Sequence, residues 1–399
     1  MEKTSLESTI IMELQKKLEQ GNQAALQEFW DMVETKGAPL IEKIDGDLEN
    51  SLITFIYKVD EEIENIVLMP PVDWDNLQES KMHRLLETNL WYITCKLKSN
   101  VRFAYAFSIN DSFDNNFDKK TLVHDKSNKN ISVFEGENGE KDTLRSYIVM
   151  PNAPEHFWVK ERNDVPKGNL HEHEFNSKNS EKGRRVRIYT PYGYEKDKQP
   201  YGFLLLTDGN EYIYTLSTIA VLNNLIADKK IPPIVTIFID STETRMEELK
   251  CNDNFSSIIV EELLPWTRDN YNITSKALKS IIGGLSLGGL TASYLGLKHS
   301  EVFGNVLSQS GSYWYAPEDY KGEFWIGKQY EALDKLPLKF YLNVGILETK
   351  DRMIDTNIKL RDVLIEKGYA VDFEYFNSGH DYLSWGETLA NGLISLIGV

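Results

Sequence analysis

The sequence has few cysteines, no long apolar run and no concentrated positive charge. Its only cysteines, Cys95 and Cys251, lie far apart and outside any C-x-x-C spacing, which excludes a disulfide framework and a thiolate metal site. Residues 1–15 carry three acidic groups and no unbroken apolar stretch, so we expect neither a secretory signal nor a membrane span. Together these absences predict a protein of the reducing cytoplasm.

The charge balance is strongly acidic, with a formal net charge of −17 over 399 residues. Such a charge repels the phosphates of nucleic acids and the head groups of anionic lipids. Because no block of lysine and arginine offsets it, we expect neither nucleic acid nor membrane as a partner. The apolar fraction of 41% suffices for globular folding, and the length exceeds the usual size of one core, so two domains are expected.

The N-terminal part, residues 1–155, predicts a small helical lead followed by an antiparallel β-sandwich. Apolar residues recur at helical spacing between Leu6 and Leu18 and again between Ala25 and Val33. The β-rich runs that follow are separated by turn-forming residues and lie at 52–59, 66–69, 90–97 and 101–109. Residues 110–141 are rich in Asn, Asp, Lys and Gly and predict loops.

The C-terminal part, residues 156–399, predicts an α/β domain in which regular alternation begins near Arg184. A polar connector precedes it, and the His171-Glu172-His173 run in that connector predicts a solvated segment rather than a metal site. The expected strands are 185–190, 203–207, 234–240, 280–283, 306–309, 339–344 and 371–376. Apolar strands that alternate with helices predict a mainly parallel sheet covered on both faces, with the chemistry at the carboxyl ends of the strands.

A nucleophile elbow stands out at Ser286. The segment 280–290 is an apolar strand, then G-x-S-x-G, then the start of a helix. In an α/β-hydrolase this sequence of elements presents the serine on a sharp, strained turn, and glycines two positions before and after it allow the helix to pack closely on the strand. The same turn places Leu287 at the helix N-terminus, where its N–H can stabilise an oxyanion.

The serine requires a base and an acid, which follow it in the chain order Ser, acid, His. His380 lies in a turn after the last expected strand, whereas His299 ends the helix that follows the elbow and fits a helix terminus better. The loop after strand 339–344 offers two carboxylates. Glu348 is preferred as the acid, and Asp351 remains the alternative.

A second oxyanion donor is expected from an earlier strand-to-helix loop. The turn 207–210 follows a buried strand, and its glycine allows the backbone to bend there. The N–H of Gly209 or of Asn210 is therefore expected to act beside that of Leu287.

These motifs resemble those of the enterochelin (ferric enterobactin) esterase family. The resemblance rests on the elbow at 283–290, on 307–314 (Leu-Ser-Gln-Ser-Gly-Ser-Tyr-Trp), on 379–381 (Gly-His-Asp) and on 205–209 (Leu-Leu-Thr-Asp-Gly). The N-terminal half also resembles that family's β-sandwich leader domain, so the likeness extends over most of the chain.

The resemblance implies a cytoplasmic serine esterase that cleaves the ester backbone of a ferric catecholate siderophore and so releases iron. It implies that Arg245 and Trp314 lie near the anionic iron–catecholate head, and that Glu348 corresponds to a glutamate of the family. No cofactor or resident metal is expected, because the iron arrives with the substrate.

Two other functions stay open at this point. The same triad could remove feruloyl or acetyl groups from carbohydrates, with the sandwich as a sugar-binding module. A non-catalytic siderophore-binding protein is the third possibility, although the complete serine, histidine and acid set argues against it.

Overall fold

The computed structural model describes residues 1–113, 122–134, 143–179 and 183–399. The chain divides into two compact units, Met1–Pro154 and Glu155–Val399, and each is treated by itself below. Among the helices of these described ranges, none combines the length and the apolar character needed to cross a bilayer.

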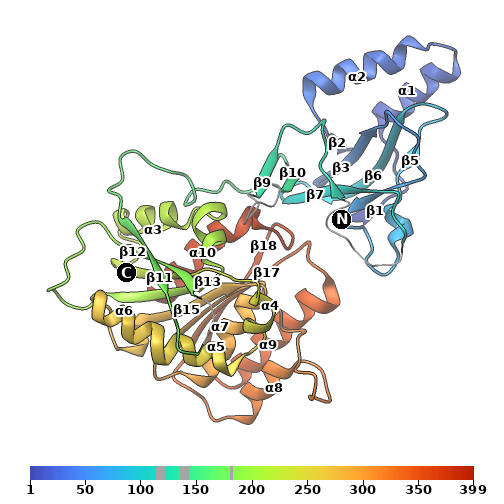
Figure 1. Ribbon diagram of the computed structural model, residues 1–399. Helices are drawn as coiled ribbons and strands as arrows, with labels where there is room; N and C mark the ends of the chain where they lie inside the picture. Colours follow the sequence, from blue (N-terminus) through green and yellow to red (C-terminus); the bar gives the residue numbers. More distant parts are fainter. Residues whose placement is uncertain (114–121, 135–142, 180–182) are drawn as a thin grey trace. The chain divides into compact units, whose positions relative to one another are not determined.

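The described residues of the first unit form two α-helices, a short 3-10 helix and two antiparallel sheets (Figure 1). Ser8 caps the first helix by accepting a hydrogen bond from the N–H of Ile11, as expected for a serine at this position. One sheet has the strand order β1-β6-β3-β2, with β5 on β6, and the other has the order β4-β7-β10-β9, with β8 on β7. The elements are β1 Glu2–Lys3, α1 Thr9–Glu19, α2 Ala24–Lys36, β2 Leu40–Ile44, β3 Asp47–Lys58, β4 Ile66–Met69, η1 Leu77–Ser80, β5 His83–Arg84, β6 Leu90–Lys98, β7 Arg102–Ile109, β8 Leu122–Val123, β9 Ile131–Phe134 and β10 Thr143–Val149.

Aromatic side chains join the two sheets of this unit. The ring of Phe55 on β3 lies 4.9 Å from that of Tyr105 on β7, and Tyr57 lies 5.2 Å from Phe107, both with edge-on geometry. Edge-to-face contacts of this kind add to the burial of large apolar surfaces in a core.

The second unit is built on one eight-stranded sheet with the order β11-β12-β14-β13-β15-β16-β17-β18. Strands β11 and β12 are antiparallel, and from β14 to β18 every neighbouring pair is parallel. The strands are β11 Asn169–Phe175, β12 Arg184–Thr190, β13 Gly202–Thr207, β14 Ile234–Ile239, β15 Ser280–Leu285, β16 Asn305–Gln309, β17 Lys339–Gly345 and β18 Ala370–Phe376.

Helices cover both faces of this sheet (Figure 1). Alternate residues of one strand enter opposite cores: Phe203 of β13 packs with the side of α5 to α9, and Leu204 packs with the side of α3 and α10. This is the α/β architecture predicted from the sequence. The helices are η3 Glu211–Thr215, α3 Thr218–Ala227, α4 Arg245–Glu248, α5 Asp253–Ser257, η4 Ile258–Leu263, α6 Leu264–Asn270, η5 Ala277–Lys279, α7 Leu287–Lys298, α8 Trp325–Ala332, η6 Lys350–Ile354, α9 Asp355–Glu366 and α10 Tyr382–Ile397.

Two predictions from the sequence were wrong. The segment predicted as a polar connector contains β11. The first four residues of this strand are all exposed, so β11 lacks the alternation of apolar and polar residues by which a strand is predicted. It forms because the backbone of β12 offers it a hydrogen-bonding edge. Likewise, part of the predicted loop 110–141 forms β8 and β9, while residues 114–121 and 135–141 of that stretch lie outside the described residues.

Candidate active site

Ser286 occupies the sharp turn between β15 and α7. Its backbone has φ 55° and ψ −118°, a conformation that costs a non-glycine residue about 1–3 kcal/mol and that recurs at functional sites. A Cβ on Gly284 would lie 2.4 Å from the carbonyl carbon of Gly288, and one on Gly289 would lie 2.5 Å from the hydroxyl of Ser308. Glycine is therefore required for α7 to approach the sheet closely enough to present the serine.

The end of β16 and the loop after it contact the backbone and the hydroxyl of Ser286. The N–H of Ser286 donates to the carbonyl of Gln309 at 2.9 Å, and the N–H of Ser312 donates to the carbonyl of Ser286 at 3.0 Å. The hydroxyl of Ser312 lies 3.3 Å from that of Ser286. Hydrogen bonds on both sides of the serine thus fix the strained turn.

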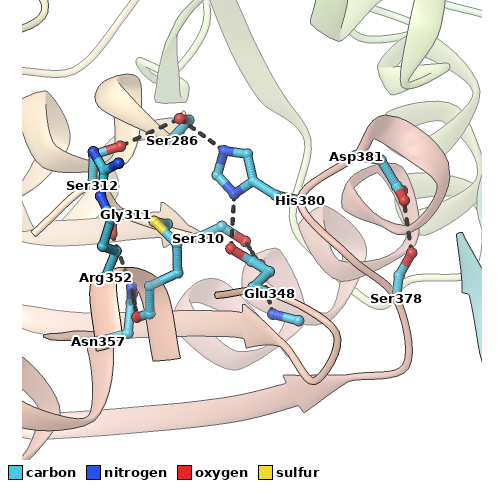
Figure 2. Close-up of polar contacts among 12 residues, drawn as sticks. Ser286, Ser310, Gly311, Ser312, Glu348, Arg352, Asn357, Ser378, His380 and Asp381 are labelled. Carbon is cyan, nitrogen blue, oxygen red and sulfur yellow. Dashed lines mark hydrogen bonds and ion pairs between the residues drawn. The ribbon is translucent and has the colours of Figure 1, made fainter. Parts of the chain in front are cut away.

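His380 reaches Ser286 from the turn after β18 (Figure 2). Its Nε2 lies 3.0 Å from the Oγ of Ser286, the distance needed for proton transfer between a nucleophile and its base. The next residue, Asp381, caps α10 by accepting from the N–H of Leu383 at 3.0 Å. The cap fixes the turn that carries the imidazole. The side chain of His380 remains 37% exposed.

Glu348 is the carboxylate that contacts the imidazole (Figure 2). Its Oε2 lies 2.7 Å from Nδ1 of His380, and its side chain is completely buried. Its Oε1 accepts hydrogen bonds from the hydroxyl of Ser310 at 2.6 Å and from the N–H of Gly345 at 2.7 Å. Asp351, the alternative acid, lies exposed in η6. The structure thus joins serine, histidine and glutamate in one hydrogen-bonded chain, the arrangement that activates a hydroxyl as a nucleophile.

The two expected oxyanion donors lie at the ends of neighbouring strands. Leu287 opens α7, and the turn with Gly209 and Asn210 follows β13, which pairs with β15. A Cβ on Gly288 would lie 2.5 Å from the hydroxyl of Thr207, so the first turn of α7 and the end of β13 are in close contact. A Cβ on Gly209 would meet the side chain of Phe238 at 2.9 Å, which explains the glycine.

The structure pairs Arg245 with an aspartate of the same turn. The guanidinium donates from Nε and Nη2 to the two carboxylate oxygens of Asp208, at 2.6 and 2.7 Å. Asp208 is buried and has a positive φ of 55°, and the hydroxyl of Ser241 also donates to it. Arg245 therefore braces the turn and carries a charge that Asp208 largely neutralises.

Trp314 lies beneath a second arginine. The guanidinium carbon of Arg352 is 4.3 Å from the centre of the Trp314 ring, within the range of a cation–π contact. Asn357 donates to the carbonyl of Gly311 at 2.8 Å, so the start of α9 is tied to the loop that contains Trp314 and Ser312. Arg352 is exposed and takes part in none of the ion pairs found among the described residues. Arg245 is paired with the carboxylate of Asp208, whereas none of those ion pairs offsets the charge of Arg352.

The sequence analysis missed Ser310, Ser312 and Arg352 as members of the site. A signal was present for the serines, because the Ser-Gln-Ser-Gly-Ser run forms the carboxyl end of a buried parallel strand and the turn after it, where functional groups collect. Arg352 offered no comparable signal, since nothing in the sequence shows which aromatic ring it contacts.

The remaining histidines lie elsewhere. His173 on β11 has its Nε2 2.6 Å from the hydroxyl of Tyr271, and burial, together with the neighbouring His171, lowers its pKa. His299 ends α7 and pairs with Glu301 at 3.4 Å, as a helix-terminal residue would. In the part of the chain that the structure describes, no three His, Cys, Asp or Glu side chains are grouped so as to hold a metal ion.

Comparison with known proteins identifies the family to which the chain belongs. A family model described as "Putative esterase" matches residues 177–396. The chain is 30% identical to the iron(III) enterobactin esterase of Escherichia coli over 340 residues, which are 80% of this chain and 82% of that protein. It is 25% identical to an iron(III) salmochelin esterase of Escherichia coli over 96% of each chain.

Among solved structures, the enterobactin esterase of Shigella flexneri, determined in the presence of enterobactin, superposes with a TM-score of 0.72 at 25% identity. The match covers 91% of this chain and 96% of that one. An endo-1,4-beta-xylanase/feruloyl esterase of Xylanibacter ruminicola is 28% identical, but over only 44% of this chain and 26% of that protein. Similarity over most of the chain thus relates it to the siderophore esterases, whereas the feruloyl esterase matches less than half of it.

Proposed function

Because this chain belongs to the enterobactin esterase family and is a carboxylic ester hydrolase, we propose that it hydrolyses the ester bonds of a ferric catecholate siderophore built on an enterobactin-like trilactone. The observation that carries the proposal is the hydrogen-bonded chain from Ser286 through His380 to Glu348, in a chain similar to siderophore esterases over most of its length. Hydrolysis opens the backbone that holds the catecholates together, and the iron enters as part of the substrate.

In the proposed mechanism, the Oγ of Ser286 attacks the ester carbonyl while Nε2 of His380 takes its proton. The carbonyl oxygen becomes an oxyanion, which the N–H of Leu287 and that of Gly209 or Asn210 stabilise. Such donors each contribute about 10²- to 10³-fold to kcat. The imidazolium then protonates the departing alkoxide, and the acyl group remains on the serine.

Deacylation repeats the sequence with water. Nε2 of His380 takes a proton from water, the hydroxide attacks the acyl carbon, and Ser286 leaves with that proton restored to its oxygen. The products are a free carboxylate and a free alcohol. Throughout, Glu348 holds Nδ1 and stabilises the positive imidazolium.

We propose that Arg352 and Trp314 receive the anionic iron–catecholate head. A guanidinium stacked on an indole leaves its N–H edge open to an anion, and the aromatic face of tryptophan suits a catechol ring. Arg245 remains a candidate contact because its side chain is 29% exposed, but Asp208 compensates its charge. We therefore assign the larger electrostatic share to Arg352.

We propose that residues 1–155 form the β-sandwich leader domain of this family and residues 156–399 the catalytic domain. The two antiparallel sheets joined by Phe55, Tyr105 and their neighbours support the sandwich assignment. We also place the reaction in the cytoplasm. Both cysteines are free thiols, which suits a reducing compartment, and cell fractionation would test this location.

The test of the function is hydrolysis of a purified ferric tricatecholate trilactone, followed by chromatography, beside methyl ferulate and an acetylated xylo-oligosaccharide. The expected result is a kcat/KM for the trilactone that exceeds both others by about three orders of magnitude or more, the discrimination that buried polar contacts allow. Ser286→Ala should abolish turnover and keep the fold. Preference for the ferulate or the acetyl ester would overturn the siderophore assignment and leave the triad in place.

A further inference from the structure

Four side chains, one of them the acid of the site, form a closed ring of contacts. Nδ1 of His380 meets Oε2 of Glu348 at 2.7 Å, the hydroxyl of Ser310 donates to Oε1 of Glu348 at 2.6 Å, and Nε1 of Trp385 donates to the hydroxyl of Ser310 at 3.1 Å. The ring of Trp385 then returns to the imidazole, with centroids 5.1 Å apart and planes at 90°. We propose that Ser310 and Trp385 are positioning residues that fix the acid and the base of the triad.

The backbone at Ser310 shows that a side chain is held there against a conformational cost. Its φ is 49°, in the left-handed region that glycine occupies freely and that costs other residues about 1–2 kcal/mol. The N–H of Ser310 donates to the carbonyl of Asn343 at 3.0 Å, which joins the ends of β16 and β17 in this conformation. Glycine would fit the turn better, so the hydroxyl is the feature that serine adds.

The hydroxyl of Ser310 holds one carboxylate oxygen of Glu348, so that the other oxygen faces His380. Oε1 accepts from Ser310 and from the N–H of Gly345, and Oε2 is left for the imidazole. Without the hydroxyl, a single donor holds Oε1, and the carboxylate can rotate away from Nδ1. Since Ser310 is fully buried, it acts through Glu348 and touches no substrate.

Trp385 connects this arrangement to helix α10, which follows the turn of His380. Its side chain is 2% exposed, and its backbone carbonyl accepts from Nε2 of Gln309 at 2.6 Å. Gln309 in turn accepts from the hydroxyl of Tyr212 at 2.8 Å. The backbone of Trp385 is thus anchored independently of its indole. The indole packs edge-on against the imidazole of His380 and orients the hydroxyl of Ser310 by donating a hydrogen bond to it.

The experiment compares Ser310→Ala with Ser310→Gly. Both remove the hydroxyl, but glycine also relieves the positive φ. If Ser310 positions the triad, both variants lower kcat by about 10- to 100-fold, the scale of a misplacement near 1 Å, with KM changed by less than about twofold. Recovery of kcat in Ser310→Gly would overturn the proposal, because the variant lacks the hydroxyl and the hydroxyl would then be dispensable for the geometry of the triad.

Ser293→Ala is the matched control. Ser293 is equally buried, and its hydroxyl lies 2.8 Å from that of Tyr313, outside the ring. This variant should lower thermal stability and keep kcat. A loss of kcat in Ser293→Ala equal to that in the Ser310 variants would refute a specific role for Ser310.

A second readout separates this inference from the proposed function on which it rests. A fluorophosphonate probe forms a bond from phosphorus to the Oγ of Ser286 and releases fluoride, with the serine proton passing through His380, so its rate reports the triad whatever the natural ester is. Failure of the unaltered protein to react would defeat the catalytic assignment itself. Rapid labelling of that protein, with equally rapid labelling of Ser310→Ala and Ser310→Gly, would defeat only the positioning role.

Discussion

Replacing Glu348 by glutamine tests the acid of the site without changing its shape. The backbone N–H of Gly345 can only donate, and it points at Oε1, so the amide oxygen of the new side chain must occupy that place. The amide nitrogen then faces Nδ1 of His380, where Oε2 lies now at 2.7 Å. Nδ1 must accept a hydrogen bond, and the imidazole proton moves to Nε2.

The expected loss of kcat follows from this tautomer. With a proton on Nε2, the imidazole faces the Oγ of Ser286 as a donor and cannot take its proton. In chymotrypsin-type proteases the equivalent exchange of acid for amide lowers kcat by about 10⁴-fold, which corresponds to about 5 kcal/mol of barrier. We expect a loss of that order for Glu348→Gln, with KM almost unchanged because Glu348 is buried away from the substrate.

The assay is steady-state ester hydrolysis beside thermal unfolding, with Asp351→Asn as the matched control. Asp351 is the other carboxylate of the same loop and is exposed, so its loss should leave kcat unchanged. If Glu348→Gln kept more than about a tenth of kcat while Asp351→Asn lost most of it, the assignment of the acid would be wrong. A large fall in the melting temperature of Glu348→Gln would instead indicate a structural defect, and Glu348→Asp, which keeps the negative charge, would then be compared.

Three further perturbations test other parts of the structure. Arg352→Met should raise KM for a ferric tricatecholate about 10- to 100-fold, which is the value of one or two charged hydrogen bonds. The control is Arg361→Met, which removes a guanidinium 4.9 Å from the ring of a phenylalanine on β18 and should leave KM unchanged. Equal effects of the two variants on KM would refute the role of Arg352. Gly284→Ala should cost about 1–3 kcal/mol of unfolding free energy or abolish folding, because its Cβ would lie 2.4 Å from the backbone of α7, and an unchanged denaturation midpoint would contradict the close packing. Arg187→Leu should cost about 3–5 kcal/mol in urea unfolding, because Arg187 is 2% exposed and its guanidinium contacts both carboxylate oxygens of the largely buried Asp240, at 2.7 and 2.8 Å. The double variant with Asp240→Leu should recover part of that loss.

Much of the second unit was predictable because its strands are buried on both faces. Runs such as 203–207 and 234–239 are almost wholly apolar, and such runs between helices indicate parallel strands. The edge strand β11 was not predictable in this way. Its stability comes from pairing with β12, and a solvent-exposed edge needs no apolar pattern.

The site was predictable where one short segment carries the signal and unpredictable where distant segments meet. The elbow of Ser286 is such a local motif. The choice between Glu348 and Asp351 depends on how one loop turns toward His380, and the pairing of Arg245 with Asp208 joins residues 37 positions apart. Contacts of this kind depend on tertiary packing, and a single sequence does not contain them in readable form.

The order of the strands also governs when this protein becomes active during its own synthesis. Strands β15, β16, β17 and β18 are neighbours in both sequence and space, and each is followed by at least one polar member of the site. Ser286 precedes His380 by 94 residues, so at about 5–20 residues per second a ribosome carries the nucleophile for about 5–20 s before its base exists. The nascent chain therefore passes through a period in which the nucleophile has been synthesised but lacks its base, and reactivity at the serine reports that the chain has extended past the last strand of the sheet.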